Sequence, residues 1–156
     1  MSSILLVDDR VRTVIDLSEA LGDLNRGEVF SCLDIFGAIE KWGENKNDIS
    51  HIITDLSMNP LGLNKKERKT TSGGLYTGWV WLWNYVIKDY DEEMPEKIFK
   101  DYNIIIFSEY INNMDDYKFV SEKEKLCYDS LINKIAKGKE NSQQLLIECV
   151  KNYRDR

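Results

Sequence analysis

The sequence predicts an α/β fold, in which a five-stranded parallel sheet is doubly wound and carries helices on both faces. Short apolar runs rich in β-branched residues alternate along the chain with segments whose apolar residues recur every three or four positions. A polar residue follows each run directly, as happens where parallel strands end at a ligand-binding edge. Parallel strands need a crossover between them and 156 residues suit one core, so we expect a single domain over residues 1–156.

Five runs have the length and composition of strands buried in such a sheet. They cover residues 4–7, 29–33, 51–54, 103–107 and 130–133. The third run gives the strongest signal, because it is apolar, β-branched and followed at once by Asp55. His51, the only histidine, is expected to start this strand at the far end of the sheet and not to act in catalysis.

Helical spacing of apolar residues predicts five helices between and after the strands. They cover residues 11–21, 35–42, 74–90, 111–128 and 141–153. Trp79, Trp81 and Trp83 make the third helix apolar on more than one side, so it is either deeply buried or presents one face to a partner. Two stretches lack this spacing: 59–73, a basic inserted loop that we expect to be mobile, and 89–101, an acidic connector.

Composition narrows the classes of partner and location. The formal net charge of −6 argues against non-specific nucleic-acid binding, which needs a basic surface, so no direct nucleic-acid contact is expected. No stretch approaches the roughly 20 apolar residues of a membrane helix, and the amino terminus lacks a signal-peptide pattern, so we expect a cytoplasmic protein without membrane contact. Cys32, Cys127 and Cys149 are widely spaced within apolar patterns, which favours reduced core thiols over metal ligands.

The polar residues at the predicted strand ends form a candidate site. Asp8 and Asp9 follow the first strand and Asp55 follows the third, so three carboxylates are expected to converge. Without a counter-charge they would repel one another in a partly desolvated crevice, which predicts raised pKa values or a bound cation. Hard oxygen ligands left open to water suit Mg²⁺. Ser108 and Lys134 follow the fourth and fifth strands at the same edge.

These motifs, taken in order, resemble the response-regulator receiver domain of two-component signalling, of the chemotaxis-regulator kind. That family carries an acidic pair after strand one, a phosphoacceptor aspartate after strand three, a serine or threonine after strand four and a lysine after strand five. The matching stretches are residues 6–9, 54–58, 106–108 and 133–134. The resemblance implies a flavodoxin-like sheet with strand order 2-1-3-4-5.

The resemblance also implies a role for each residue of the site. Asp55 would accept a phosphoryl group, because a carboxylate can act as a nucleophile and form an acyl phosphate. Lys134 would pair with one phosphoryl oxygen and the Ser108 hydroxyl would donate to another, moving toward the phosphoryl group as it does so. Mg²⁺ would be held by Asp9 and Asp55, with Asp8 helping directly or through water, and by the backbone carbonyl of Ser57.

The sequence departs from the family pattern at several positions. Ile135 follows Lys134, where the family usually has a proline, and Glu109 follows Ser108, where a small residue is usual. The position of the aromatic switch residue, three before the lysine, falls on Leu131, although Tyr128 is near. The inserted loop would lie beside the phosphorylation site.

Three functions are compatible with these observations. The first is a stand-alone receiver in a phosphorelay, which takes its phosphoryl group from a histidine kinase or a phosphotransfer protein and signals through contact with an unknown downstream protein. Such a receiver is a signalling module, not an enzyme with a separate substrate. The second is a pseudo-receiver that binds partners independently of phosphorylation. The third is a Mg²⁺-dependent phosphohydrolase, which fits less well because such enzymes place Asp-x-Asp on strand one, and here Asp8 and Asp9 are adjacent.

Overall fold

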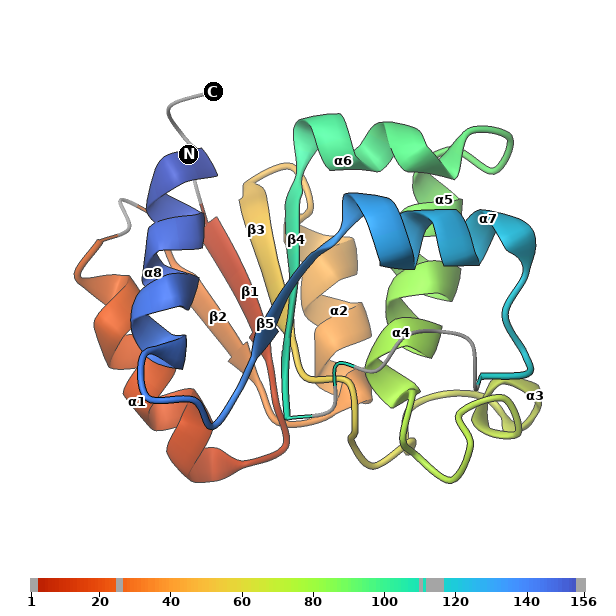
Figure 1. Ribbon diagram of the computed structural model, residues 1–156, viewed down its shortest axis with the longest axis horizontal. Coiled ribbons are helices and arrows are strands. Elements are labelled where there is room, and N and C mark those ends of the chain that lie inside the picture. Colours follow the sequence, from red (N-terminus) through yellow and green to blue (C-terminus); the bar gives the residue numbers. More distant parts are fainter. Residues whose placement is uncertain (1–2, 25–26, 110, 112–116, 154–156) are drawn as a thin grey trace.

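The computed structural model describes residues 3–24, 27–109, 111 and 117–153, and in them a parallel sheet lies between two layers of helices (Figure 1). Its strands are β1 Ser3–Val7, β2 Val29–Cys32, β3 Ile49–Thr54, β4 Asn103–Ser108 and β5 Asn133–Ala136. They pair in the order β2-β1-β3-β4-β5, all parallel. The predicted fold class and strand order are confirmed.

The inner strands are apolar over most of their length because successive side chains enter two different cores. Ile4 and Leu6 of β1 pack on one face of the sheet, whereas Leu5 and Val7 pack on the other. The helices α1 (Val11–Gly22) and α8 (Ser142–Tyr153) cover the first face. The second face is covered by α2 (Ile35–Asn45) and by a continuous helix made of α4 (Thr77–Trp81), the π-helical stretch η1 (Leu82–Ile87) and α5 (Lys88–Tyr90).

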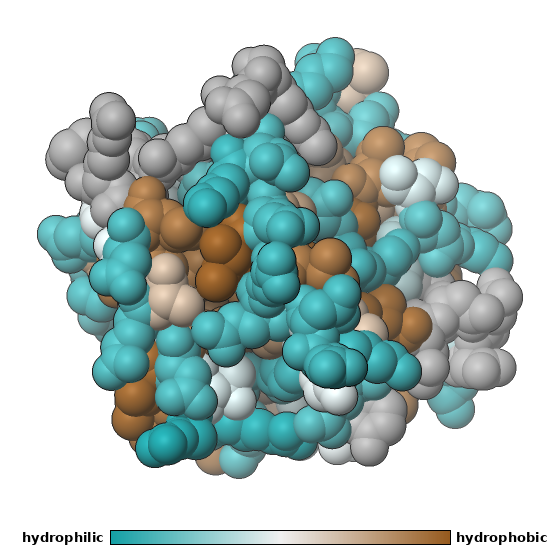
Figure 2. Space-filling view, turned by 60° about the vertical axis from the view of Figure 1, so that its left-hand side comes forward, coloured by the Kyte–Doolittle hydropathy of each residue, from teal (hydrophilic) through white to brown (hydrophobic). Residues whose placement is uncertain are grey.

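The surface differs from these cores in composition. On the side shown in Figure 2, where the left-hand part of Figure 1 comes forward, hydrophilic residues cover most of the face and hydrophobic residues form separate patches. Within the described residues, no helix is long and apolar enough to cross a membrane.

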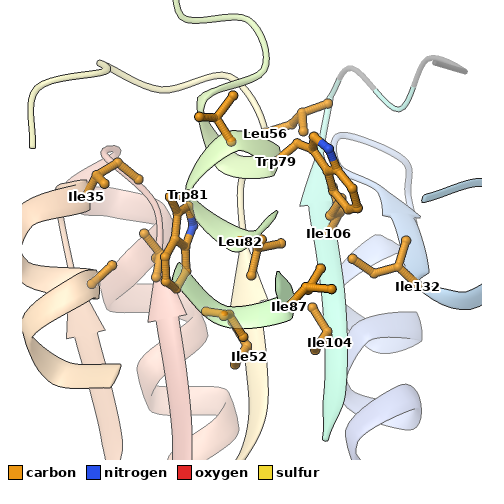
Figure 3. Close-up of a cluster of buried hydrophobic side chains, with 14 of the residues drawn as sticks. Ile35, Ile52, Leu56, Trp79, Trp81, Leu82, Ile87, Ile104, Ile106 and Ile132 are labelled. Atoms are coloured by element: carbon orange, nitrogen blue, oxygen red, sulfur yellow. The ribbon is translucent and has the colours of Figure 1, made fainter. Parts of the chain in front are cut away.

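Two of the three tryptophans of the third predicted helix are buried and the third, Trp83, is half-buried, which favours deep burial of this helix. Trp79 and Trp81 are fully shielded from solvent and lie on different sides of α4 (Figure 3). The Trp79 indole N–H donates to Glu124 Oε1 at 3.1 Å, and that of Trp81 donates to Thr54 Oγ1 at 3.2 Å. Because both indole donors have partners, the burial of these large rings stabilises the core without leaving a polar group unsatisfied.

The inserted segment 59–73 contains regular structure where the sequence predicts only a loop. Helix α3 (Lys65–Arg68) begins with a capping box, in which Asn64 and Glu67 bond to each other's backbone N–H groups. The Tyr85 hydroxyl donates to Glu67 Oε1 at 2.7 Å, and the Tyr117 hydroxyl donates to the Thr70 carbonyl at 2.5 Å. These long-range bonds attach the insertion to η1 and to the segment that precedes α7.

Two other predicted segments differ in detail. The acidic connector 89–101 contains a 3₁₀ turn, η2 (Pro95–Lys97), and helix α6 (Ile98–Asp101). The predicted helix 111–128 is α7 (Glu122–Leu126) continued by the π-helical stretch η4 (Cys127–Leu131), and its residues 112–116 lie outside the described part of the chain.

The fifth strand begins where the sequence predicts that it ends. Residues 130 and 131 belong to η4, and the Ile132 N–H bonds to the Cys127 carbonyl at 3.0 Å, which extends the helical turn. Asn133 is the first residue of β5 and pairs with Ile105, and Ala136 pairs with Ser108. Lys137, not Lys134, is therefore the residue that follows this strand.

The cysteines and the histidine lie within the fold, although His51 is the third residue of β3 where the sequence predicts the first. Cys32 and Cys127 are buried, and burial raises the pKa of each thiol to about 11, so both stay protonated at neutral pH. Cys149 is half-buried and also unbonded to another cysteine. His51 is buried within β3, where its Nδ1 lies 3.2 Å from the Asn103 side-chain amide.

Helix α4 is pressed against the residues that follow β3. The Gly78 N–H donates to the Leu56 carbonyl at 2.8 Å, and the Thr77 hydroxyl donates to the Met58 carbonyl at 2.7 Å. A Cβ atom on Gly78 would lie 1.9 Å from the Asp55 carbonyl oxygen, so only glycine permits this approach.

Replacing Gly78 therefore tests how the end of β3 is positioned. Gly78→Ala is expected to lower the free energy of unfolding by roughly 3 kcal/mol or more, because α4 has to move away from backbone atoms. Gly43→Ala is the matched control: Gly43 is exposed in α2, a Cβ there meets nothing within 4 Å, and the change is expected to raise stability by up to about 1 kcal/mol. Urea denaturation measures both, and equal effects would contradict the close approach.

Candidate functional site

The structure brings the three predicted carboxylates together at the carboxyl ends of β1 and β3. Asp8 and Asp55 are almost fully buried, whereas Asp9 is exposed. One oxygen from each carboxylate lies within 4.8 Å of the others. The strand order explains this, because β1 and β3 are neighbours and Val7 pairs with Thr54, which puts the next residues side by side.

A lysine that the sequence analysis did not select supplies the positive charge of the site. Lys137 Nζ lies 2.5 Å from Asp8 Oδ2 and 3.0 Å from Asp55 Oδ2. All three side chains are at least nine-tenths buried. Burial raises the pKa of Asp8 above its usual value, and the hydrogen bond from Lys137 opposes this shift.

Lys134, which the sequence analysis selected for this role, does not follow β5, and its ammonium group lies away from the carboxylates. Its Nζ bonds to the carbonyls of Tyr128 and Asp129 and lies 4.8 Å from the centre of the Tyr128 ring. Burial lowers the pKa of Lys134. This difference follows from the displaced fifth strand, since Lys134 is inside β5 and pairs with Ile106. Gly138, with its positive φ of 84°, marks the true end of the strand, and this glycine is the sequence signal that could have located Lys137.

Backbone N–H groups orient each carboxylate of the cluster. The Arg10 N–H donates to Asp8 Oδ1 at 2.9 Å, and the Leu56 N–H donates to Asp55 Oδ1 at 2.7 Å. The Asn59 N–H donates to Asp9 Oδ2 at 3.3 Å. Charge-assisted bonds of this kind fix the carboxylates without adding side-chain charge.

Ser108 and Ser57 lie at the same edge. Ser108 is buried as the last residue of β4, and its carbonyl accepts a hydrogen bond of 2.9 Å from the Lys137 N–H, which joins β4 to the residue after β5. Ser57 lies two residues after Asp55 and is half-buried. The carbonyls on both sides of it, those of Leu56 and Met58, bond to α4.

A second ion pair, also missed from the sequence, spans the site. Arg10 Nη1 lies 2.7 Å from Glu109 Oε1, and the two side chains are about half exposed. Each partner stabilises the charge of the other: the pKa of Arg10 is raised by Glu109, and the pKa of Glu109 is lowered by Arg10. No local pattern reveals this pair, because its residues are 99 positions apart.

The carboxylate cluster fits a magnesium ion in chemistry and in size. Oxygens that share one Mg²⁺ at about 2.1 Å lie at most about 4.2 Å from one another. The three carboxylates need only a small inward movement from their separation of up to 4.8 Å. Asp9, which is exposed, leaves a side open to water, and Mg²⁺ keeps several water ligands.

Solved structures with a similar fold come from response regulators. A response-regulator receiver domain from Clostridium thermocellum matches with a TM-score of 0.63 at 18% sequence identity, covering 100% of this chain and 96% of that one. The chemotaxis protein CheY4 of Vibrio cholerae matches with a TM-score of 0.59 at 17% identity, over 97% and 98% of the two chains. A third match, with a TM-score of 0.59 at 17% identity, is a chain of the CheX–CheY–BeF₃–Mg complex from Borrelia burgdorferi, over 97% and 88%.

These matches confirm the predicted resemblance at the level of the fold. The chain has the receiver-domain fold over its whole length. No protein-family model matches the sequence, and no curated protein matches it.

The two lysines can be separated by their effects on the carboxylates. Lys137→Met leaves Asp8 and Asp55 buried without their positively charged partner, so it is expected to lower the free energy of unfolding by roughly 3 kcal/mol in the presence of EDTA. A divalent cation is expected to restore part of this loss. Lys134→Met, the matched control, removes bonds to two carbonyls and a contact with the Tyr128 ring, and it is expected to give no cation-dependent difference. Denaturation with and without Mg²⁺ measures both, and a cation effect confined to Lys134→Met would reverse the assignment.

Proposed function

We propose that this chain is a phosphoacceptor receiver in a two-component phosphorelay, which takes a phosphoryl group on Asp55 and signals through protein contacts. The observation that carries the proposal is the position of Asp55: a buried carboxylate at the end of β3, beside Lys137 and two further carboxylates, within a receiver fold. We therefore propose that the chain is a signalling module and not an enzyme with a separate substrate.

Asp55 is suited to be the nucleophile of this transfer. One of its oxygens attacks the phosphorus of the donor, the bond between phosphorus and the leaving atom breaks, and the leaving group keeps the electron pair. Because negative charge spreads over the phosphoryl oxygens, catalysis depends on positioning and on positive charge. The bond from the Leu56 N–H holds Oδ1 of Asp55 in place, and this leaves Oδ2, now paired with Lys137, as the candidate attacking atom.

Two residues around Asp55 are proposed to bind the phosphoryl group. Lys137 would pair with one oxygen as a point charge, which is the role first expected of Lys134. Ser108 would donate its hydroxyl to another oxygen. Both act from adjacent positions, because the Lys137 N–H bonds to the Ser108 carbonyl.

Magnesium is the proposed cofactor. The carboxylates of Asp8, Asp9 and Asp55 and the carbonyl of Ser57 would hold it. When bound, it would neutralise phosphoryl oxygens and the repulsion between the carboxylates. Among solved structures of similar fold, one complex contains BeF₃ and Mg and another is a BeF₃-activated receiver domain of DrrB, and we extend this chemistry to the present chain.

If Lys137 is the lysine of the family pattern, two of the differences between this sequence and that pattern change. Gly138, and not Ile135, follows the lysine, and Lys134, and not Leu131, stands three residues before it. The position of the aromatic switch residue is therefore occupied by a lysine. We infer that a signal from Asp55 leaves the site by a route other than an aromatic side chain at this position.

The proposed partners are proteins. A histidine kinase or a phosphotransfer protein would supply the phosphoryl group, and a downstream protein would read the phosphorylated state. The Borrelia burgdorferi structure is a complex of CheY with CheX, which supports a protein as the partner. The net charge of −6 disfavours direct contact with nucleic acid, and three cysteines without a disulfide between them suit the expected cytoplasmic location.

Phosphorylation of Asp55 is tested by intact-mass spectrometry after incubation with acetyl phosphate and Mg²⁺. The wild type is expected to gain one phosphoryl group, Asp55→Asn none, and Lys137→Ala at least tenfold less than wild type in the same time. Lys134→Ala is the matched control and is expected to react like the wild type. Equal modification of wild type and Asp55→Asn would contradict Asp55 as the acceptor.

Phosphorylation, Mg²⁺ binding and phosphomonoester turnover, measured together, separate the alternative functions. A wild type that binds Mg²⁺ but stays unmodified, also with a cognate donor protein, would favour the phosphorylation-independent pseudo-receiver. Turnover of a simple phosphomonoester would favour the phosphohydrolase, whereas no turnover is expected of a receiver.

Magnesium binding is tested by thermal unfolding. Added Mg²⁺ is expected to raise the midpoint of the wild type, because a ligand that binds only the folded state stabilises it. Asp9→Asn is expected to weaken this response by about tenfold in Mg²⁺ concentration, since it removes one charged ligand. Asp16→Asn, on the exposed side of α1, is the control and should respond like the wild type. An identical response of all three proteins would place the ion elsewhere.

A further inference from the structure

The Arg10–Glu109 ion pair joins residues on either side of β3, the strand that Asp55 follows. Arg10 lies shortly after β1, and Glu109 lies directly after β4. These strands are not neighbours, since β3 lies between them in the sheet (Figure 1). The 2.7 Å contact between the two side chains therefore bridges the carboxyl end of β3, which Asp55 follows directly.

The burial of the carboxylates agrees with this arrangement. Asp55 is only 5% exposed although it lies at the edge of the sheet. Helix α4 covers its backbone from one side, and Lys137 occupies the space between it and Asp8. The ion pair joins the residues that follow β1 and β4, the two strands on either side of β3.

The backbone at both ends of the ion pair is held in place, whereas the two charged side chains are not. The Arg10 N–H bonds to Asp8, and its carbonyl accepts a bond of 3.1 Å from the Val14 N–H at the start of α1. Glu109 is adjacent to the buried Ser108. Both charged side chains, in contrast, are about half exposed, and ion pairs at such positions hold only weakly. The bridge can thus open by side-chain rotation alone.

We propose that Arg10 and Glu109 form an ion-paired cover over Asp55, which limits the access of small phosphoryl donors and of water to the acceptor. The cover is neutral as a whole, so it acts by obstruction and not by attracting or repelling an anionic donor. A cognate donor protein would displace it with its own contacts. This inference rests on the proposed function, and it assigns to the chain a selectivity for donors that can open the pair.

A different role for the same residues makes opposite predictions. If Arg10 and Glu109 acted as two independent charges near the site, removing the positive one would slow the approach of an anionic donor and removing the negative one would speed it. If they form a cover, removing either partner opens it. Removing both would add little, because the pair is already broken.

The test compares Arg10→Gln, Glu109→Gln and the double variant in two rates: phosphorylation of Asp55 by acetyl phosphate at saturating Mg²⁺, and hydrolysis of the isolated phosphoprotein. We expect both rates to rise two- to fivefold in each single variant and no further in the double variant, since an exposed pair favours its closed form by a factor of up to about five. Salt should bring the wild type toward the variants, because it screens the pair. Arg12→Gln and Glu148→Gln repeat the charge changes on exposed faces of α1 and α8, and they should leave both rates unchanged.

The outcomes are distinguishable. Opposite signs for the two single variants, or rates equal to the wild type in all three, would overturn the cover and leave the phosphoacceptor role intact. Absence of phosphorylation in every protein, with Asp55→Asn as the reference, would overturn the proposed function and the cover together.

Discussion

Two carboxylates held almost out of water need a positive charge beside them, and much of this structure follows from that requirement. Asp8 and Asp55 lie at the ends of adjacent strands, and Lys137 supplies the charge from the far side of the sheet. To reach them, β5 has to end at Ala136, and the chain turns at once at Gly138, which has a positive φ. A magnesium ion offers the same neutralisation with more charge, so lysine and metal are alternative solutions to one electrostatic problem.

The sequence predicts the fold and the positions of three residues at the edge of the sheet because the inner strands are buried on both faces. Such strands read as unbroken apolar runs, and the polar residue after each run is easy to identify. Asp8, Asp55 and Ser108 were located in this way. The edge strand β5 is different: its four residues are all half-buried, and Leu131-Ile132 beside it is apolar although it precedes the strand. A pattern of apolar residues places that strand three positions too early, and the lysine with it.

Contacts between distant residues account for what the sequence could not predict. Nothing near residues 59–73 indicates that Tyr85 and Tyr117 will donate hydrogen bonds to Glu67 and to the Thr70 carbonyl. The insertion is consequently part of the packed structure on the second face of the sheet, beside the loop that follows Asp55. These two hydrogen bonds join the insertion to η1 and to the segment before α7, a connection that periodicity and composition do not reveal.

The hydrogen bond of Trp81 also gives the molecule an internal optical probe. Its indole N–H donates to the Thr54 hydroxyl, which in turn donates to the Asp55 carbonyl. The emission of a tryptophan depends on the electric field and the hydrogen bonds around its ring, and this ring is shielded from solvent. Charge placed on Asp55 changes the electric field at this ring, so we expect the emission of Trp81 to respond to events at that carboxylate, against a background from the other three tryptophans.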